Sequence, residues 1–180
     1  MRGLVVTPER GLMVLDTPRD PLVVHLGRVL ILIDAFTGRA SALRGLAKLA
    51  RLDFLLRFPV YLEAVLSERD RPLPFDLRAT YDERRAPEGA RIRWKYGPWD
   101  HRYYPLLGRL VGQGLVSPDR VAGELTLRST TAGRDAVTAL EGPEWDLVRG
   151  RARALKRGAD LRAERLGELI SPLLTEVEPS

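Results

Sequence analysis

Residues 103–140 read "YYPLLGRLVGQGLVSPDRVAGELTLRSTTAGRDAVTAL", and they carry the most specific pattern of helix, strand and turn signals in the chain. Its first part predicts an amphipathic helix that ends at Gly114, because large apolar residues recur at helical spacing. These residues are Tyr103, Leu106, Leu107, Leu110 and Val111. Two strands should follow, with turns at 117–119 and at Gly123, because Leu125 and Leu127 alternate with polar residues.

Thr130 or Thr131 then suits the N-cap of a further helix. The order of helix, strand, turn, strand and helix predicts a winged helix-turn-helix. Upstream of it, residues 91–96 alternate as in a strand, Gly97-Pro98 can turn the chain, and Asp100 can cap the first helix.

The N-terminal half contains apolar segments with helix start and stop signals. Residues 21–36 predict a helix, with a buried strand as the alternative. Ser41 suits the N-cap of a second helix with one apolar face. That face is formed by Leu43, Leu46, Ala47, Ala50 and Phe54. Pro59 should break or kink this helix, and the prolines of residues 69–76 indicate a linker.

Two further helices are predicted after Gly142. Pro143 starts the first, whose apolar stripe consists of Trp145, Val148, Ala152 and Leu155. An apolar face around residues 166–173 indicates the second, which Pro172 should end. The fold class is therefore mainly α with small β wings (α+β), a winged helix-turn-helix with additional N- and C-terminal helices. The expected divisions are residues 1–77, 78–142 and 143–180.

Composition excludes several classes of protein. The 180-residue chain has no cysteine, which excludes disulfides, thiolate metal sites and cysteine nucleophiles. No apolar run approaches the roughly 20 residues that cross a bilayer, and no export signal is evident, so we expect a cytoplasmic protein. The net charge of +5 is concentrated in residues 78–109, which carry eight arginines or lysines and four acids. That stretch suits phosphate, an acidic protein partner or simple solvation.

No motif for catalysis or for nucleotide binding occurs in the sequence. Only two histidines are present. His25 lies in an apolar helix and suits a packed boundary position, and His101 beside Asp100 and Tyr103 suits packing better than acid–base chemistry. We therefore expect no catalytic residue, no cofactor and no metal site, and the chain is not expected to be an enzyme.

Four segments resemble one known family. They are "GLAKLARLDFLLRFPVYLEAVL", the segment "IRWKYGPWD", "RYYPLLGRLVGQGLV" and "RLGELISPLL". Together they resemble the small middle components of bacterial ABC-ATPase three-component conflict systems, the group that includes Lamassu-type antiviral defence. The resemblance implies a winged-helix adaptor between an SMC- or Rad50-like ABC ATPase and an effector, often a nuclease. It carries over no catalytic residue.

Two groups of residues are candidate contact sites. Aromatic and arginine anchors concentrate in interface centres, so a partner interface is expected at Trp99, Arg102, Tyr103 and Tyr104 and along Trp145, Val148 and Leu155. The main alternative is a DNA-binding transcriptional regulator, or duplex DNA as a further partner of the adaptor complex. Arg44, Lys48 and Arg51 share one face of the predicted second helix, which suits either duplex DNA or solvent.

Overall fold

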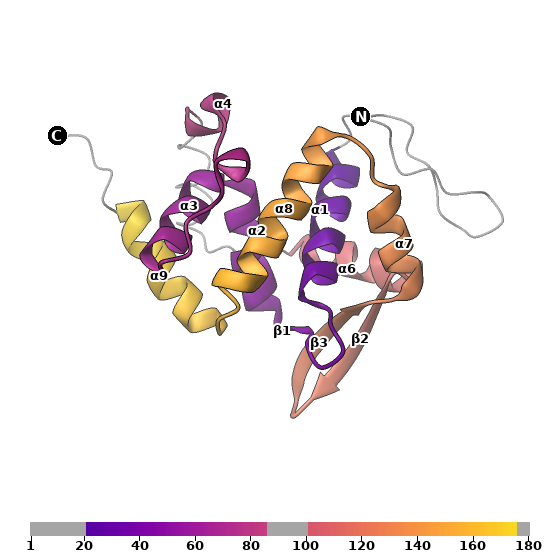
Figure 1. Cartoon of the computed structure of the whole chain (residues 1–180). Coiled ribbons are helices and arrows are strands. Elements are labelled where there is room, and N and C mark those ends of the chain that lie inside the picture. Colours follow the sequence, from indigo (N-terminus) through magenta and orange to yellow (C-terminus); the bar gives the residue numbers. More distant parts are fainter. Residues whose placement is uncertain (1–20, 86–100, 176–180) are drawn as a thin grey trace. The chain divides into compact units, whose positions relative to one another are not determined.

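The computed structural model describes residues 21–85 and 101–175 of the chain (Figure 1). Within them the chain is mainly helical with a three-stranded antiparallel sheet, which confirms the α+β class. The chain divides into two compact units. Unit 1 comprises Met1–Arg44 and His101–Arg149, and unit 2 comprises Gly45–Asp100 and Gly150–Ser180. The predicted strand at 91–96 and the turn at 97–98 lie outside the described residues.

This division differs from the predicted ranges 1–77, 78–142 and 143–180. Helix α1 (Pro21–Phe36) contacts α6, β3 and α7, which all follow residue 100, so it shares a core with them. The prediction divided the chain into three consecutive ranges, whereas unit 1 combines two stretches that are distant in the sequence. Helix α8 (Pro143–Gly158) belongs to unit 1 up to Arg149 and to unit 2 from Gly150.

Helix α6 (Tyr103–Gly112) buries the predicted stripe of Tyr103, Leu106, Leu107 and Leu110, while Val111 is half-buried. Its N-cap is Arg102 rather than Asp100. The helix ends in a Schellman motif at Gly114, which has a φ of 70°. The Leu115 N–H donates to Leu110 O and the Gly114 N–H to Val111 O, both at 2.9 Å.

The sheet has the strand order β1-β3-β2, with β1 at Leu43–Arg44, β2 at Val116–Val121 and β3 at Glu124–Ser129. The turn between β2 and β3 uses Ala122 and Gly123 at φ 51° and 82°, which matches the twist of a tight hairpin. The predicted turn at 117–119 is wrong, because these residues continue β2. Pro118 is tolerated there because β2 is an edge strand.

The start predicted for the second helix is also wrong. Leu43 and Arg44 form β1, in which Leu43 pairs with Leu127, and helix α2 (Leu46–Arg57) begins only after Gly45. Gly45 has a φ of 81°, a left-handed conformation that interrupts any helix begun at Ser41. The apolar face therefore lacks Leu43, which is fully buried in unit 1 instead.

Helix α7 (Thr131–Ala139) is held at both ends by side chains of unit 1. Thr130 is its N-cap, as predicted, and its hydroxyl accepts from the Gly133 N–H at 3.0 Å. At the other end, Arg149 of α8 donates to Val137 O at 2.9 Å and to Leu140 O at 2.8 Å. The carbonyls left unpaired at the helix end are thus satisfied by a cation.

Unit 2 packs α2, α3 (Pro59–Glu68) and α9 (Ala163–Thr175) against one another. Pro59 starts α3 and separates it from α2, as predicted. Phe54 lies 4.9 Å from Phe58 and 5.8 Å from Tyr61 between ring centroids, which joins these two helices. Pro172 lies inside α9, so the prediction that it ends the helix is wrong.

After α3 the described part of unit 2 continues with two short elements, η2 (Phe75–Leu77) and α4 (Tyr81–Arg84). Among the residues that the structure describes, no helix combines the length and the apolar character needed to cross a bilayer.

Two leucines test the assignment of the core of unit 1. Leu110 in α6 and Leu127 in β3 are 2% and 1% exposed. We expect Leu110→Ala or Leu127→Ala to lower the free energy of unfolding by about 2–5 kcal/mol, because each leaves a cavity. Denaturant unfolding measures this. The control is Val121→Ala at an exposed position of β2, expected within about 0.5 kcal/mol of wild type. Losses below that value at both leucines would contradict the assignment.

A close contact between two helices gives a second test in unit 1. A Cβ added to Gly27 of α1 would lie 2.5 Å from Cη2 of Trp145 in α8. Gly27→Ala should therefore cost about 1–3 kcal/mol through overpacking, and Trp145→Leu in the same chain should relieve part of that cost. Gly108→Ala in α6 is the matched control.

At Gly108 an added Cβ meets no atom within 4 Å, so alanine should stabilise the chain by about 0.5–1 kcal/mol. Thermal unfolding of the two glycine variants compares them directly. Equal effects of both substitutions would contradict the contact between Gly27 and Trp145.

Candidate functional site

A groove in unit 1 lies between the first turns of α1 and one side of α6. Its volume is about 530 Å³. Its lining from α1 consists of Pro21, Leu22 and His25, and its lining from the α6 side of Arg102, Pro105, Leu106 and Arg109. The α6 side follows the spacing i, i+3, i+4 and i+7, so these residues form one continuous stripe along the helix.

The groove is basic and partly apolar. Among the described residues that line it, Arg102, Arg109 and His25 contribute the polar side chains. The His25 ring packs edge-on against the ring of Tyr103, with centroids 5.6 Å apart and an interplanar angle of 77°. His25 is therefore a packed, half-buried residue, as predicted from the sequence. Leu22 at the groove is 41% exposed.

The predicted interface around residues 99–104 is divided by the structure. Arg102 lines the groove, and Tyr104 is 59% exposed on α6. Tyr103 is a core residue, because it is only 1% exposed, and its place in the expected interface is corrected. Trp99 lies outside the described residues.

The predicted stripe on α8 is also mainly core. Trp145 and Leu155 are 4% and 0% exposed, so neither side chain is available to a partner helix. Trp145 fills the space beside Gly27 of unit 1, which explains its burial. Val148 is half-buried.

Arg44, Lys48 and Arg51 do not share one helix face. Arg44 is exposed in β1 of unit 1, whereas Lys48 and Arg51 lie in α2 of unit 2. Lys48 is buried and forms an ion pair with Asp160 at 2.5 Å. Arg51 is half-buried, and Gly167 of α9 lies beside its guanidinium. The expectation of one exposed basic face is therefore corrected.

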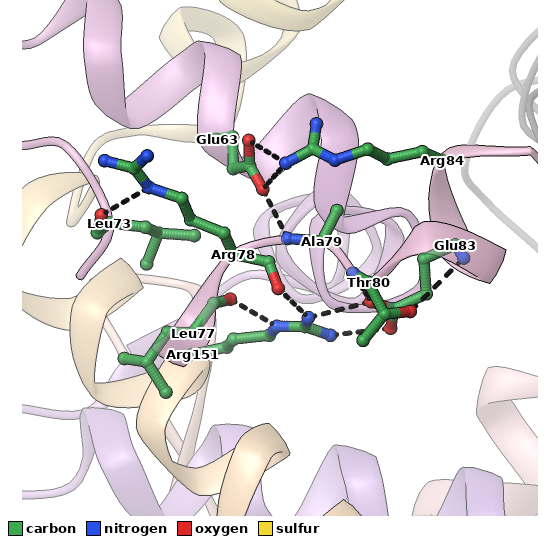
Figure 2. Close-up of polar contacts among 9 residues, drawn as sticks. All are labelled: Glu63, Leu73, Leu77, Arg78, Ala79, Thr80, Glu83, Arg84 and Arg151. Atoms are coloured by element: carbon green, nitrogen blue, oxygen red, sulfur yellow. Dashed lines mark hydrogen bonds and ion pairs between the residues drawn. The ribbon is translucent and has the colours of Figure 1, made fainter. Parts of the chain in front are cut away.

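A second polar site surrounds Arg151 in unit 2 (Figure 2). Its guanidinium is 3% exposed and donates to Leu77 O and Arg78 O, both at 2.9 Å. It also donates to both carboxylate oxygens of Glu83, at 2.8 and 2.9 Å. Such two-point pairing fixes geometry as well as charge. Helix α8 thereby holds the segment that runs from η2 to α4.

Burial of the Glu83 carboxylate raises its pKa. The opposite effect is larger, and it comes from the hydrogen bond from Arg151, the backbone hydrogen bond from Thr80 and the positive charge of Arg151. The pKa of Glu83 is therefore lowered below its ordinary value of 4.5. Thr80 and Glu83 also form a capping box at the start of α4, in which each side chain accepts from the other residue's N–H. Glu83 is thus a charged anchor under physiological conditions.

Glu63 of α3 holds the same segment from another element. Its carboxylate accepts from the Ala79 N–H and pairs with Arg84 at 2.9 Å, as Figure 2 shows. Two large aromatic side chains on this fixed segment face solvent, since Phe75 is 87% and Tyr81 is 72% exposed. Rigid backbone with exposed aromatic groups is suited to contact with another protein.

Sequence reasoning missed most of these groups. The spacing of Arg102, Leu106 and Arg109 in the sequence was a signal for the α6 side of the groove. A signal for Arg151 was that the residues three and four positions away on its helix face are all apolar, namely Leu147, Val148, Ala154 and Leu155. In the described ranges, no three His, Cys, Asp or Glu side chains gather in a way that could hold a metal ion.

Replacement of Arg151 tests the second polar site. We expect Arg151→Met to lower the free energy of unfolding by about 3 kcal/mol, because Glu83 and two carbonyls lose their donor. Arg151→Lys should cause a smaller loss of unfolding free energy than Arg151→Met, since an ammonium cannot pair with Leu77, Arg78 and Glu83 at once. The control is Arg153→Met, an exposed position on the same helix, with an effect below about 0.5 kcal/mol. Equal unfolding midpoints of the two methionine variants would contradict this role.

The pH dependence of stability tests Glu83. Because its pKa is lowered on folding, its contribution is complete above the ordinary value of 4.5 and is lost as the pH falls through the folded-state value. The wild type should therefore exceed Glu83→Gln by about 1 kcal/mol at pH 7, a value reduced by partial exposure of the carboxylate. The difference should shrink at pH 3. Urea unfolding at both pH values measures this. A stability difference between wild type and Glu83→Gln that is the same at pH 7 and pH 3 would contradict the role of Glu83.

Comparison with known protein families, with curated proteins and with solved structures finds no match to this chain.

Proposed function

We propose that the chain is a winged-helix adaptor subunit without enzymatic activity. It links an SMC- or Rad50-like ABC ATPase to an effector, such as a nuclease, in a bacterial antiviral defence complex in the cytoplasm. The observation that carries the winged-helix part is the sheet order β1-β3-β2 in unit 1.

The topology of unit 1 supports this fold. Helix α1 precedes β1, α6 precedes the hairpin of β2 and β3, and β3 returns to pair with β1. A winged helix shares this strand order, and in it the hairpin is the wing and the helix before the hairpin meets a partner or DNA. Between β1 and α6 the chain passes through residues 45–100, which belong to unit 2.

The organisation into two units supports an adaptor. Each unit has its own set of packed helices, so one chain can offer separate surfaces to two partners. Unit 1 offers the groove and Tyr104, and unit 2 offers Phe75 and Tyr81. The ATPase and the effector themselves are proposed on the resemblance in sequence to the middle components of three-component systems.

The second candidate function is a DNA-binding transcriptional regulator. It is favoured by Arg102 and Arg109, which are exposed on the helix that would enter the major groove of duplex DNA. Within the adaptor proposal, duplex DNA is a further partner of the assembled complex. The two functions differ in whether the chain acts alone.

Co-expression tests the adaptor function. The full chain is produced with the ATPase and the effector encoded by adjacent genes, and the mixture is separated by size-exclusion chromatography. We expect one ternary complex. Tyr104→Ser in unit 1 and Phe75→Ser in unit 2 should each release one partner and keep the other, because loss of an aromatic anchor costs about 2 kcal/mol or more.

Thermal unfolding of the isolated variants is the control, since both side chains are exposed and neither change should alter stability by more than about 0.5 kcal/mol. A chain that elutes alone would contradict the adaptor function. If that chain also binds one operator about 10³-fold more tightly than random duplex, it is a regulator.

A further inference from the structure

We propose that strand β2 of unit 1 is closed to strand addition, because Pro118 and Asp119 together remove the backbone donors that an added strand needs. A second copy of the chain, or an extended segment of a partner, is thereby prevented from extending the sheet at this edge. Contacts of the hairpin with other molecules must then be made through side chains. This inference does not depend on the proposed adaptor function.

The outer side of β2 is accessible. The strand is at one end of the order β1-β3-β2, and residues 117–121 are all exposed. An accessible edge strand is a template for another strand, because every second residue directs its N–H and C=O away from the sheet. The other side of β3 is occupied, since β1 pairs with it and Thr37 accepts from the Ser129 N–H. Strand β2, rather than β3, is therefore the edge that a further strand would reach.

The register of the hairpin shows which groups of β2 point outward. The two-residue turn at 122–123 has positive φ at both positions, so the pair of Val121 and Glu124 that flanks it is hydrogen-bonded. Hydrogen-bonded and non-hydrogen-bonded pairs alternate along an antiparallel ladder. Every second residue from Val121 therefore bonds to β3, whereas Pro118 and Arg120 direct their backbone groups to the outer side.

Neither of these two outward residues has an N–H for an added strand. Pro118 lacks this group, because its nitrogen is part of the ring. The Arg120 N–H donates to Oδ1 of Asp119 at 2.7 Å, so the side chain of the preceding residue takes the place of a partner strand. Only carbonyl acceptors are left at the two positions. An antiparallel hydrogen-bonded pair needs a donor and an acceptor from the same residue, and neither position supplies both.

Tolerance of proline at an edge would explain Pro118 alone. It does not explain why Asp119, a residue type that is rare in strands, follows it and accepts from the next outward N–H. The Arg120 guanidinium donates to Gly123 O at 3.0 Å, which keeps a cation beside the same edge. Proline and charged side chains are the means by which native edge strands avoid pairing, and β2 uses both.

The test restores the two donors. The edge variant is Pro118→Val/Asp119→Val in the full chain, which supplies an N–H at position 118 and releases the N–H of Arg120. Its matched control is Ser117→Val/Glu124→Val, which introduces the same two side chains and also removes one carboxylate. Both control positions are exposed, and their N–H groups bond to the opposite strand of the hairpin. Thermal unfolding checks that the variants are folded.

Self-association is measured by sedimentation velocity over a range of protein concentrations. We expect the edge variant to dimerise with a Kd roughly tenfold or more below that of wild type or the control, because the recovered donors add hydrogen bonds between the copies. In the dimer the N–H groups of positions 118 and 120 should exchange slowly with solvent deuterium. Arg120→Pro added to the edge variant should raise the Kd again, because it removes an outward donor and leaves the bonds to β3 intact.

The proposal is overturned if the edge variant associates no more strongly than wild type. It is also overturned if the control associates as strongly as the edge variant, because apolar side chains are then responsible. Association that leaves the two N–H groups in fast exchange overturns it as well. If the edge variant does not fold, Asp119→Val alone releases the Arg120 N–H and should lower the Kd by a smaller factor, and no change in that variant overturns the proposal. These results are independent of the co-expression test of the adaptor function.

Discussion

The pairing of the two-residue strand β1 with β3 closes unit 1. Leu43 and Arg44 lie opposite Leu127 and Thr126, so the chain that leaves α1 is joined to the hairpin more than eighty positions later. Arg128 strengthens this junction, because its guanidinium donates to Gly38 O at 2.9 Å and to Ser41 O at 3.0 Å. In addition, the Ser129 N–H donates to the Thr37 hydroxyl at 2.8 Å. The sheet, the position of α1 beside α6, and hence the groove depend on this small set of bonds.

Unit 2 uses buried polar groups where unit 1 uses a sheet. Segment 77–84 has little apolar surface to bury, since only Ala79 in it is buried and Leu77 is half-buried. Arg151 and Glu63 therefore supply the order that packing does not, through bonds to backbone atoms as well as to Glu83 and Arg84. Asp160 acts in the same way between Lys48 and Lys156, which lie 2.5 Å from its two carboxylate oxygens. The loss of a charged partner should cost most at Arg151 and Lys48, because these two cations are buried.

Local signals made much of the fold predictable. Gly114, Gly123 and the Thr130 cap act within a few residues, so the C-terminal end of α6, the turn between β2 and β3 and the start of α7 follow from sequence. Strand β1 could not be found in this way, because two residues carry no periodicity and only the distant β3 makes them a strand. The surroundings of Lys48 could not be predicted for the same reason, because its partner Asp160 lies 112 positions away in the sequence. The groove likewise exists only because α1 lies beside α6, which no local pattern encodes.

The discontinuity of unit 1 has a consequence during translation. Helix α1 contains a continuous run of buried apolar residues, from Val29 to Ile33, and the elements that cover it in unit 1 follow His101. At ribosomal rates of about 5–20 residues per second, on the order of 5–20 seconds pass between synthesis of α1 and completion of these elements. During this interval the helix presents an uncovered apolar surface to the cell. We therefore expect the yield of folded protein on expression to depend on chaperones that bind exposed apolar segments.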